Sequence, residues 1–164
     1  MKSVVITGVS TGIGRYAAEY LIKQGFQVFG SIRNSSDGEA LQAQFGERFI
    51  PLLFDVTDEV AIKQAALTVT DYLAGATLSG LVNNAGIAIP GPLMHLPMSE
   101  LRHQFEVNVF GLMAVTQAFL PCLGAKLPQV EIPGRIVNIS SVAGKMTFPF
   151  LGSYASSKHA LESL

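Results

Sequence analysis

The sequence predicts an α/β fold built on a doubly wound parallel sheet, and three observations support this prediction. Apolar runs alternate with segments of helical spacing five times along the chain, which is the pattern of strands joined by right-handed helical crossovers. The mean hydropathy is +0.39 and only 14% of residues are charged, as expected for strands that are buried on both faces. The length of 164 residues suits a single domain.

Short apolar runs bounded by turn residues predict five strands: residues 3–7, 26–33, 49–54, 79–86 and 134–140. Apolar residues at helical spacing predict the helices: residues 13–24, residues 38–45, residues 58–73, a helical region from Ser99 through Phe119, and a last helix that begins at Ser153. Residues 34–38 are predicted as a turn, residues 87–97 as an irregular loop and residues 124–134 as a connection with Pro and Gly. No repeat or linker divides the chain, so residues 1–164 are predicted as one domain.

Local signals support the helix assignments. In the first helix Ile13, Ala17 and Leu21 form one apolar stripe. The helix over 58–73 opens with two acidic residues, which suit the positive end of the helix dipole. Ser99 is predicted to cap the start of the fourth helical region.

Charge and composition exclude several classes of protein. The formal net charge is −1 and the Lys and Arg residues are scattered, so no surface for nucleic acid is expected. No apolar run approaches the roughly 20 residues that a membrane-spanning helix needs. A lone Cys122 excludes an intramolecular disulfide and a cysteine zinc cluster, and His95, His103 and His159 share no ligand spacing, so no metal site is expected. Met1 leads directly into the first strand without a signal peptide, which favours a cytoplasmic location.

The turn between the first strand and the first helix has the features of a phosphate-binding loop. Its sequence is TGVSTGIG, with glycines in the spacing GxxxGxG. Glycines permit a tight turn, let backbone N–H groups approach a pyrophosphate and allow close packing of helix on strand. The turn is therefore predicted to bind a dinucleotide through six residues: Gly8, Ser10, Thr11, Gly12, Ile13 and Gly14.

The end of the second strand predicts which dinucleotide is bound. An acidic residue there would pair with the ribose 2′-OH of NAD, whereas Arg would accept the 2′-phosphate of NADP. The stretch FQVFGSIRNSS has no acid and places Arg33 at the strand end, where a guanidinium can form charge-assisted bonds to phosphate. Asp37 lies too far along the turn to read the ribose. NADP(H) is therefore favoured over NAD(H), with a solvated loop cation as the alternative for Arg33.

The ends of the third and fourth strands supply further predicted cofactor contacts. Asp55, followed by Val56, could bond the adenine amino group or simply cap the next turn. Asn83, Ala85 and Gly86 end the fourth strand. With the strand order 3-2-1-4-5 this strand lies beside the first, at the switch point where ribose and nicotinamide are expected.

Three groups capable of moving a proton lie near the end of the chain. Ser141 follows the fifth strand, and Tyr154 and Lys158 are spaced i, i+4 on the last helix. This spacing places a phenol and an ammonium on one helical face. The positive charge is expected to favour the phenolate form.

These motifs together resemble the short-chain dehydrogenase/reductase family, in its subtype with a TGxxxGxG turn. The matching motifs occur in the family's order: TGVSTGIG (7–14), DVT (55–57), NNAG (83–86), Asn108 within VNVFG, ISS (139–141) and YASSK (154–158). Each motif is weak alone, but six in register make the match specific. The resemblance implies a Rossmann-like fold and transfer of a hydride to or from a nicotinamide.

The resemblance also implies a role for each catalytic residue. Tyr154 would be the acid in carbonyl reduction and the base in alcohol oxidation, and Lys158 would also hold the nicotinamide ribose. Ser141 would hydrogen-bond the substrate oxygen as charge develops on it. Asn108 would hold a water that links the lysine to solvent, although it could instead be a satisfied core amide. Helices around Asn108 and Tyr154 pair subunits in this family, so a homo-oligomer is expected by analogy.

The chain departs from the family pattern at its end. Leu164 lies partway through the catalytic helix, whereas relatives add two strands, a helix and a loop that shapes the substrate pocket. The C-terminal part of the fold is therefore expected to be absent, with the fifth strand an exposed edge. The sequence is either part of a longer protein, which we favour, or a fragment of doubtful activity.

Two function classes follow from these features. The first is an NADP(H)-dependent oxidoreductase that interconverts a secondary alcohol and a ketone, and the second is a dinucleotide-binding module or inactive fragment without turnover. The small-molecule substrate could be apolar, because several loop residues could line an apolar pocket or else merely pack their loops: Pro90, Pro92, Met94, Phe148 and Phe150.

Overall fold

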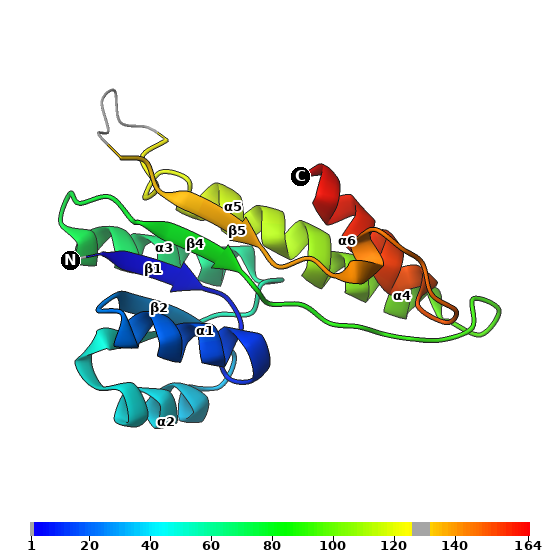
Figure 1. Ribbon diagram of the computed structural model, residues 1–164, viewed down its shortest axis with the longest axis horizontal. Helices are drawn as coiled ribbons and strands as arrows, with labels where there is room; N and C mark the ends of the chain where they lie inside the picture. Colours follow the sequence, from blue (N-terminus) through cyan, green and yellow to red (C-terminus); the bar gives the residue numbers. More distant parts are fainter. Residues whose placement is uncertain (1, 126–131) are drawn as a thin grey trace.

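The centre of the molecule is a five-stranded parallel sheet. The structure is a computed structural model and describes residues 2–125 and 132–164. The strands are β1 (Ser3–Ile6), β2 (Gln27–Ile32), β3 (Phe49–Leu53), β4 (Gly80–Asn83) and β5 (Arg135–Asn138). Their order is β3-β2-β1-β4-β5, as predicted (Figure 1). In this register Ile6 lies opposite Gly30 of β2 and Val82 of β4, so the carboxyl end of β1 lies between these two strands.

Helices cover both faces of the sheet. The helices are α1 (Gly12–Lys23), α2 (Ser35–Phe45), α3 (Glu59–Leu73), α4 (Met98–Phe105), α5 (Leu112–Phe119) and α6 (Gly152–Ser163). Three shorter helices join them: the 3-10 turns η1 (Gly46–Arg48) and η3 (Val142–Gly144), and the π-helix η2 (Glu106–Gly111). Figure 1 shows α1 and α2 on one face and α3 and α5 on the other, while α4 and α6 lie together beyond the carboxyl end of the sheet.

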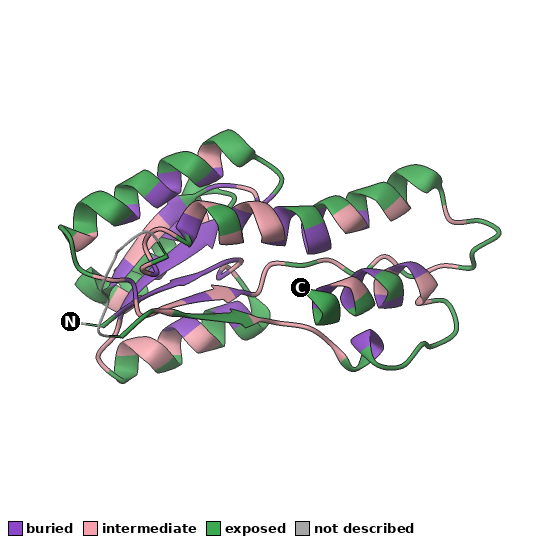
Figure 2. Ribbon diagram, turned by 90° about the horizontal axis from the view of Figure 1, so that it is seen from above, coloured by how far each residue is buried: buried purple, intermediate pink, exposed green. Residues whose placement is uncertain are grey.

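Alternation along the strands divides the part of the core that covers the sheet into two clusters, and a third, of Val109, Leu112 and Leu161, joins η2 and α5 to α6. One cluster joins β1 and β2 to α1 and α2: Val4, Ile6, Val28, Ala18 and Leu41. The other joins the opposite faces of the strands to α3 and α5: Val5, Phe29, Leu81, Ile62, Val69, Val115 and Phe119. Successive strand side chains point to opposite faces, so β1 is buried on both sides and β2 as well (Figure 2).

Several predicted helix starts are wrong, for local reasons. The predicted turn over 34–38 lies mostly inside α2, which begins at Ser35 and has Asn34 at its N-cap position without a side-chain cap bond. Ser99 does not cap α4, because the helix already begins at Met98 after Pro97. Ile13 is not part of a core stripe: its side chain is 65% exposed, and the residues of α1 buried against the sheet are Gly14 and Ala18.

The other differences concern how elements end. The predicted helical region from Ser99 through Phe119 is interrupted by the π-helix η2. The fourth strand stops at Asn83, three residues earlier than predicted. Of the predicted connection over 124–134, residues 126–131 lie outside the described part. No helix in residues 2–125 and 132–164 combines the length and the apolar composition that crossing a membrane requires.

Two predicted features are confirmed at the margins of the sheet. Asp58 and Glu59 open α3, and Asp58 Oδ1 accepts hydrogen bonds from the N–H groups of Val60 and Ala61, each at 3.0 Å. The strand β5 lies at the edge of the sheet, and its Ile136 and Val137 side chains are exposed.

Replacing Asp58 by Ala should lower the free energy of unfolding by about 1 kcal/mol, because two N–H groups of the first turn lose their acceptor. Glu59→Ala is the matched control. Its carboxylate makes an exposed ion pair with Lys63, so the loss should not exceed about 0.5 kcal/mol. Urea unfolding of both variants measures the difference, and equal losses would contradict the capping role.

Candidate active site

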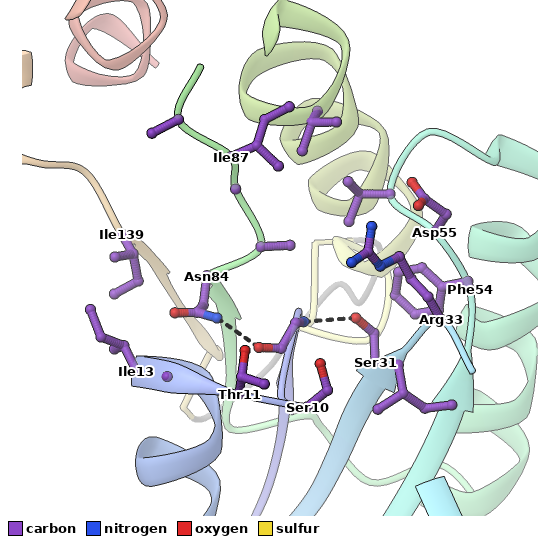
Figure 3. Close-up of a pocket in the computed structure, with 18 of the residues that line it drawn as sticks. Ser10, Thr11, Ile13, Ser31, Arg33, Phe54, Asp55, Asn84, Ile87 and Ile139 are labelled. Atoms are coloured by element: carbon purple, nitrogen blue, oxygen red, sulfur yellow. Dashed lines mark hydrogen bonds between the residues drawn. The ribbon is translucent and has the colours of Figure 1, made fainter. Parts of the chain in front are cut away.

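One pocket of about 520 Å³ lies at the carboxyl ends of the strands (Figure 3). The end of β2 and segments that follow the strands line it: residues 8, 10–13, 31–33, 54–56, 84–88 and 139–140. The pocket is completed by four side chains from helices: His103, Val107, Tyr154 and Lys158. The pocket therefore lies where ligands bind in open α/β sheets.

The glycine turn packs tightly against the start of α1 and the end of β4. Gly8 has φ +70°, and a Cβ built there would lie 3.1 Å from Ala85 Cα. A Cβ on Gly14 would collide with the carbonyl oxygen of Gly8 and with Asn84 Nδ2. Gly14 therefore has a packing role under the turn, whereas Gly8, Ser10, Thr11, Gly12 and Ile13 line the pocket.

Side chains from two strands hold this turn in place. The Gly8 N–H donates to Ser31 Oγ at 2.9 Å, and Asn84 Nδ2 donates to the carbonyl oxygen of Gly8 at 3.0 Å. Figure 3 shows both bonds converging on the turn. The backbone of the turn is therefore closely packed, and a side chain larger than that of glycine at position 8 or 14 would collide with neighbouring residues.

Arg33 and Asp55 both line the pocket, from the ends of β2 and β3. Arg33 is exposed. Asp55 Oδ1 accepts hydrogen bonds from the N–H group and the hydroxyl of Thr57, at 2.9 and 2.8 Å. Asp55 thus caps the next turn, the alternative considered for it, and still contributes to the pocket wall together with the buried Val56.

Asn83 lies outside the pocket, and Asn84 lines it instead. The Asn83 side chain is buried, and its Nδ2 donates to Thr116 Oγ1 and Asn138 Oδ1, each at 2.9 Å. Successive residues at the end of a strand point to opposite sides, so a shift of one residue exchanges a core position for a site position. Ala85 and Gly86 line the pocket.

Tyr154 and Lys158 meet on one face of α6 and both line the pocket. Lys158 Nζ lies 5.9 Å from the centroid of the Tyr154 ring and donates to the carbonyl oxygen of Ile139 at 2.8 Å. Lys158 is only 5% exposed, and this burial lowers the pKa of its ammonium group. A buried cation beside a phenol is an arrangement suited to proton transfer.

Asn108 lies next to the pocket, in the π-helix η2, and its amide is occupied by protein partners. Its Oδ1 accepts from the Ile87 N–H, and its Nδ2 donates to the Ile87 carbonyl oxygen and to Ser157 Oγ, at 2.9 to 3.0 Å. A Cβ placed on Gly86 would lie 3.2 Å from Asn108 Oδ1 and 3.6 Å from Lys158 Nζ. Gly86 therefore allows the amide and the ammonium to approach the same point.

Ser141 is half-buried and is not among the residues that line the pocket. Its Oγ accepts a hydrogen bond from the Ala143 N–H at 3.1 Å and so caps η3. A hydroxyl that accepts one bond still has its own proton to donate. Among the described residues, no cluster of three His, Cys, Asp or Glu side chains could hold a metal ion.

Several pocket residues were not singled out from the sequence as binding residues: Ser31, Phe54, Asn84, Ile87, Ala88, His103, Ile139 and Ser140. Phe54, Asn84, Ile139 and Ser140 come directly after a strand, so the sequence signal for them was their position at the carboxyl end. His103 is different, because it reaches the pocket from α4, and only the packing of α4 over the sheet end places it there.

Comparison with known proteins agrees with this geometry. The sequence matches the short chain dehydrogenase family over residues 2–164. The chain belongs to this family. An NADPH-dependent 3-dehydrocapnine reductase of Ornithobacterium rhinotracheale is 43% identical over 164 residues, which are 100% of this chain and 58% of that protein. Dehydrogenase/reductase SDR family member 9 of Bos taurus is 39% identical over 98% of this chain and 49% of its own length.

Solved structures of short-chain dehydrogenases are similar as well. The crystal structure of one from Streptomyces avermitilis matches with a TM-score of 0.86 at 35% identity, over 99% of this chain and 57% of that one. The family predicted from the six motifs is thus confirmed, and so is its Rossmann-like fold. The chain spans about half the length of the curated relatives it matches.

Replacing Gly14 by Ala should lower the free energy of unfolding by about 1–3 kcal/mol, the usual cost of overpacking, because the new methyl group meets Gly8 and Asn84. Gly91→Ala is the control, since a Cβ there would make an ordinary contact of 3.5 Å with Leu96. Chemical unfolding of both variants measures the effect. A Gly14 variant as stable as the Gly91 variant would show that the turn can move away from α1.

Proposed function

We propose that the protein is an NADP(H)-dependent oxidoreductase that interconverts a secondary alcohol and a ketone. One observation carries the proposal: a single pocket is lined at one end by the glycine turn and Arg33, and also by Tyr154 and Lys158. This shared lining supports a dinucleotide site next to a proton-transfer pair. A protein that only binds nucleotides has no need for a buried ammonium beside a phenol.

The residues present fit a phosphorylated dinucleotide. Gly12 lines the pocket, and a Cβ built on it would meet no atom within 4 Å, so a pyrophosphate can approach the backbone N–H groups at the start of α1. Arg33 is exposed at the end of β2, available to the 2′-phosphate, and no acidic side chain lies between Phe26 and Ser36. The name of the NADPH-dependent relative at 43% identity agrees with this preference.

The proton chemistry belongs to side chains of this chain. When bound, the nicotinamide supplies or accepts the hydride. Tyr154 donates its proton to the substrate oxygen during reduction and takes it back during oxidation. The Lys158 ammonium lies 5.9 Å from the centroid of the Tyr154 ring and offsets the negative charge that forms there, and the Ile139 carbonyl holds this ammonium in place.

Ser141 and Asn108 support the transfer. The Ser141 hydroxyl keeps a free proton after accepting from Ala143, so it can stabilise the substrate oxygen as charge develops. Asn108 has committed both amide protons, but its Oδ1 retains a second lone pair and lies near Lys158 across Gly86. We propose that this oxygen binds the water that connects Lys158 to solvent.

The substrate is proposed to be apolar. Large apolar side chains are exposed in the two loops that precede α4 and α6: Leu93, Met94, Phe148 and Phe150. The loops are joined where the Gly91 N–H donates to the Phe150 carbonyl oxygen at 2.8 Å. None of these four side chains lines the pocket itself. The proposal rests on their exposure in two joined loops, because exposed apolar side chains commonly mark a binding surface.

The proposal includes a homo-oligomer in the cytoplasm. Phe110, on η2 beside Asn108, is a large apolar side chain that stays exposed, which supports pairing of subunits through the helices around Asn108 and Tyr154. The lone Cys122 suits a reducing compartment.

The full chain incubated with NADPH and a panel of ketones tests the proposed function. Loss of NADPH absorbance with at least one ketone is expected. Dinucleotide binding without turnover of any ketone would instead support the binding-module alternative.

Replacing Tyr154 by Phe should lower kcat by at least about 100-fold, the lower range for a general acid, and leave the Kd for NADPH within about twofold, because only the hydroxyl is removed. Tyr20→Phe, on the exposed face of α1, should change neither quantity. Steady-state assays and fluorescence titration with NADPH measure both. Retained turnover in the Phe variant would remove Tyr154 from its role.

Replacing Arg33 by Asp should shift the ratio of kcat/KM for NADPH over NADH by about 10- to 100-fold toward NADH. The change removes a charge-assisted bond to the 2′-phosphate and adds repulsion. Arg48→Asp is the matched control, since Arg48 is exposed before β3, at the opposite end of the sheet. An unchanged ratio in the Arg33 variant would contradict its assignment to the ribose phosphate.

A further inference from the structure

The peptide of Ile89 is held from two sides by buried polar side chains. Its N–H donates to Gln104 Oε1 of α4 at 2.6 Å, and its carbonyl oxygen accepts from Ser153 Oγ of α6 at 3.0 Å. Gln104 and Ser153 are 0% and 4% exposed. One residue of the loop before α4 therefore links two helices that are far apart in the sequence.

This link matters because α6 lies away from the sheet. Figures 1 and 2 show α6 beyond the carboxyl end of the strands, beside α4 and η3. Ser153 directly precedes Tyr154, and one further bond, from the Gly91 N–H to the Phe150 carbonyl oxygen, ties the same loop to the segment before α6. The position of the phenol relative to the pocket therefore depends on the loop around Ile89.

The burial of Gln104 indicates that the fold needs its side-chain oxygen, Oε1, as a hydrogen-bond acceptor for Ile89. Among the described residues its Nε2 has no hydrogen-bond partner, although the atom is buried. Burying an amide with a donor unpaired is unfavourable compared with an apolar side chain of similar size. The only hydrogen bond of the Gln104 side chain in the described part of the chain is the one that it accepts from Ile89.

The same loop forms part of the pocket wall. Ile87 and Ala88 line the pocket just before Ile89, and Asn108 already holds both polar groups of the Ile87 backbone. With Ile87 fixed to η2 and Ile89 fixed to α4 and α6, the wall and the start of the catalytic helix move together. Loss of the bonds to Ile89 would free the start of α6, and with it Tyr154, to move relative to this wall, without touching the glycine turn.

We propose that Gln104 and Ser153 are positioning residues that act through the Ile89 peptide to place Tyr154 against the pocket. The inference rests on the proposed function, because it assigns the effect to proton transfer by Tyr154. Both side chains hold the Ile89 peptide, so removing either one should loosen it. Neither residue touches the reacting atoms.

Gln104→Met and Ser153→Ala, made singly and together in the full chain, test this inference. Each single change should lower kcat by about 10- to 100-fold, the effect of misplacing a catalytic group by about 1 Å, and leave the Kd for NADPH within about twofold. The double variant should lose little more than either single variant, because both act on one peptide. Ser153→Thr, which keeps the hydroxyl, should restore most of the activity.

Ser156 and Gln117 provide two matched controls. Ser156 is exposed on α6 and its hydroxyl donates to the Ser153 carbonyl oxygen, and Gln117 is exposed on α5. Ser156→Ala and Gln117→Met should both keep kcat within about twofold. Independent losses that multiply in the double variant, or a Kd for NADPH that rises as much as kcat falls, would overturn the inference.

Amide hydrogen exchange provides a readout that does not require turnover. Gln104→Met should speed exchange at Ile89, Gly91 and Ala155, and leave exchange in β1 and β2 unchanged. If the unmodified chain reduces no ketone, the proposed function fails, and the exchange pattern still decides whether Gln104 and Ser153 hold the loop to α6. Unchanged exchange at Ile89 and Ala155 would overturn the inference even in an active enzyme.

Discussion

The junction between the ends of β1 and β4 is the constraint on which the site depends. Thr7 Oγ1 accepts from the N–H groups of Asn84 and Ala85, each at 2.9 Å, and Asn84 Nδ2 donates to the carbonyl oxygens of Thr7 and Gly8. Parallel strands lose their regular pairing where they end, and these four bonds satisfy backbone groups that would otherwise be unpaired in a partly buried region. Because Gly14 packs directly on Gly8, the start of α1 is placed by the same junction.

The other half of the site is held in a different way. Near its start α6 relies on buried polar contacts beyond the carboxyl end of the sheet: Lys158 with Ile139, Ser157 with Asn108 and Ser153 with Ile89. Such bonds are strong in a low-dielectric interior and costly when one partner is missing. The start of the catalytic helix is thus placed by directional contacts, while its later part packs through Leu161 on Val109 and Leu112. In contrast, α1, α2, α3 and α5 pack on the sheet through apolar faces.

The fold could be predicted almost completely from the sequence, and the site only in part. Strands buried on both faces are apolar throughout, so their existence follows from composition. Their order was predicted from the dinucleotide-binding pattern that the glycine turn indicates. Helix starts were less secure, because Ser35 and Ser99 are compatible with a turn, a cap or a first helical turn. The error at Asn83 arose where a strand ends, since one residue there separates a buried side chain from one that faces the pocket.

The sequence by itself determined the order of elements, the glycine turn, Arg33 at the end of β2 and the shared helical face of Tyr154 and Lys158, because these depend on local spacing. Only the tertiary structure decided which side chains meet. It buried Lys158 against the Ile139 carbonyl, assigned the Asn108 amide to Ile87 and Ser157, placed Ser141 as a cap beside the pocket, and brought Gln104 and Ser153 to one peptide. These contacts join residues up to 64 positions apart, and no local pattern specifies them, because they form only when the loops fold over the carboxyl end of the sheet.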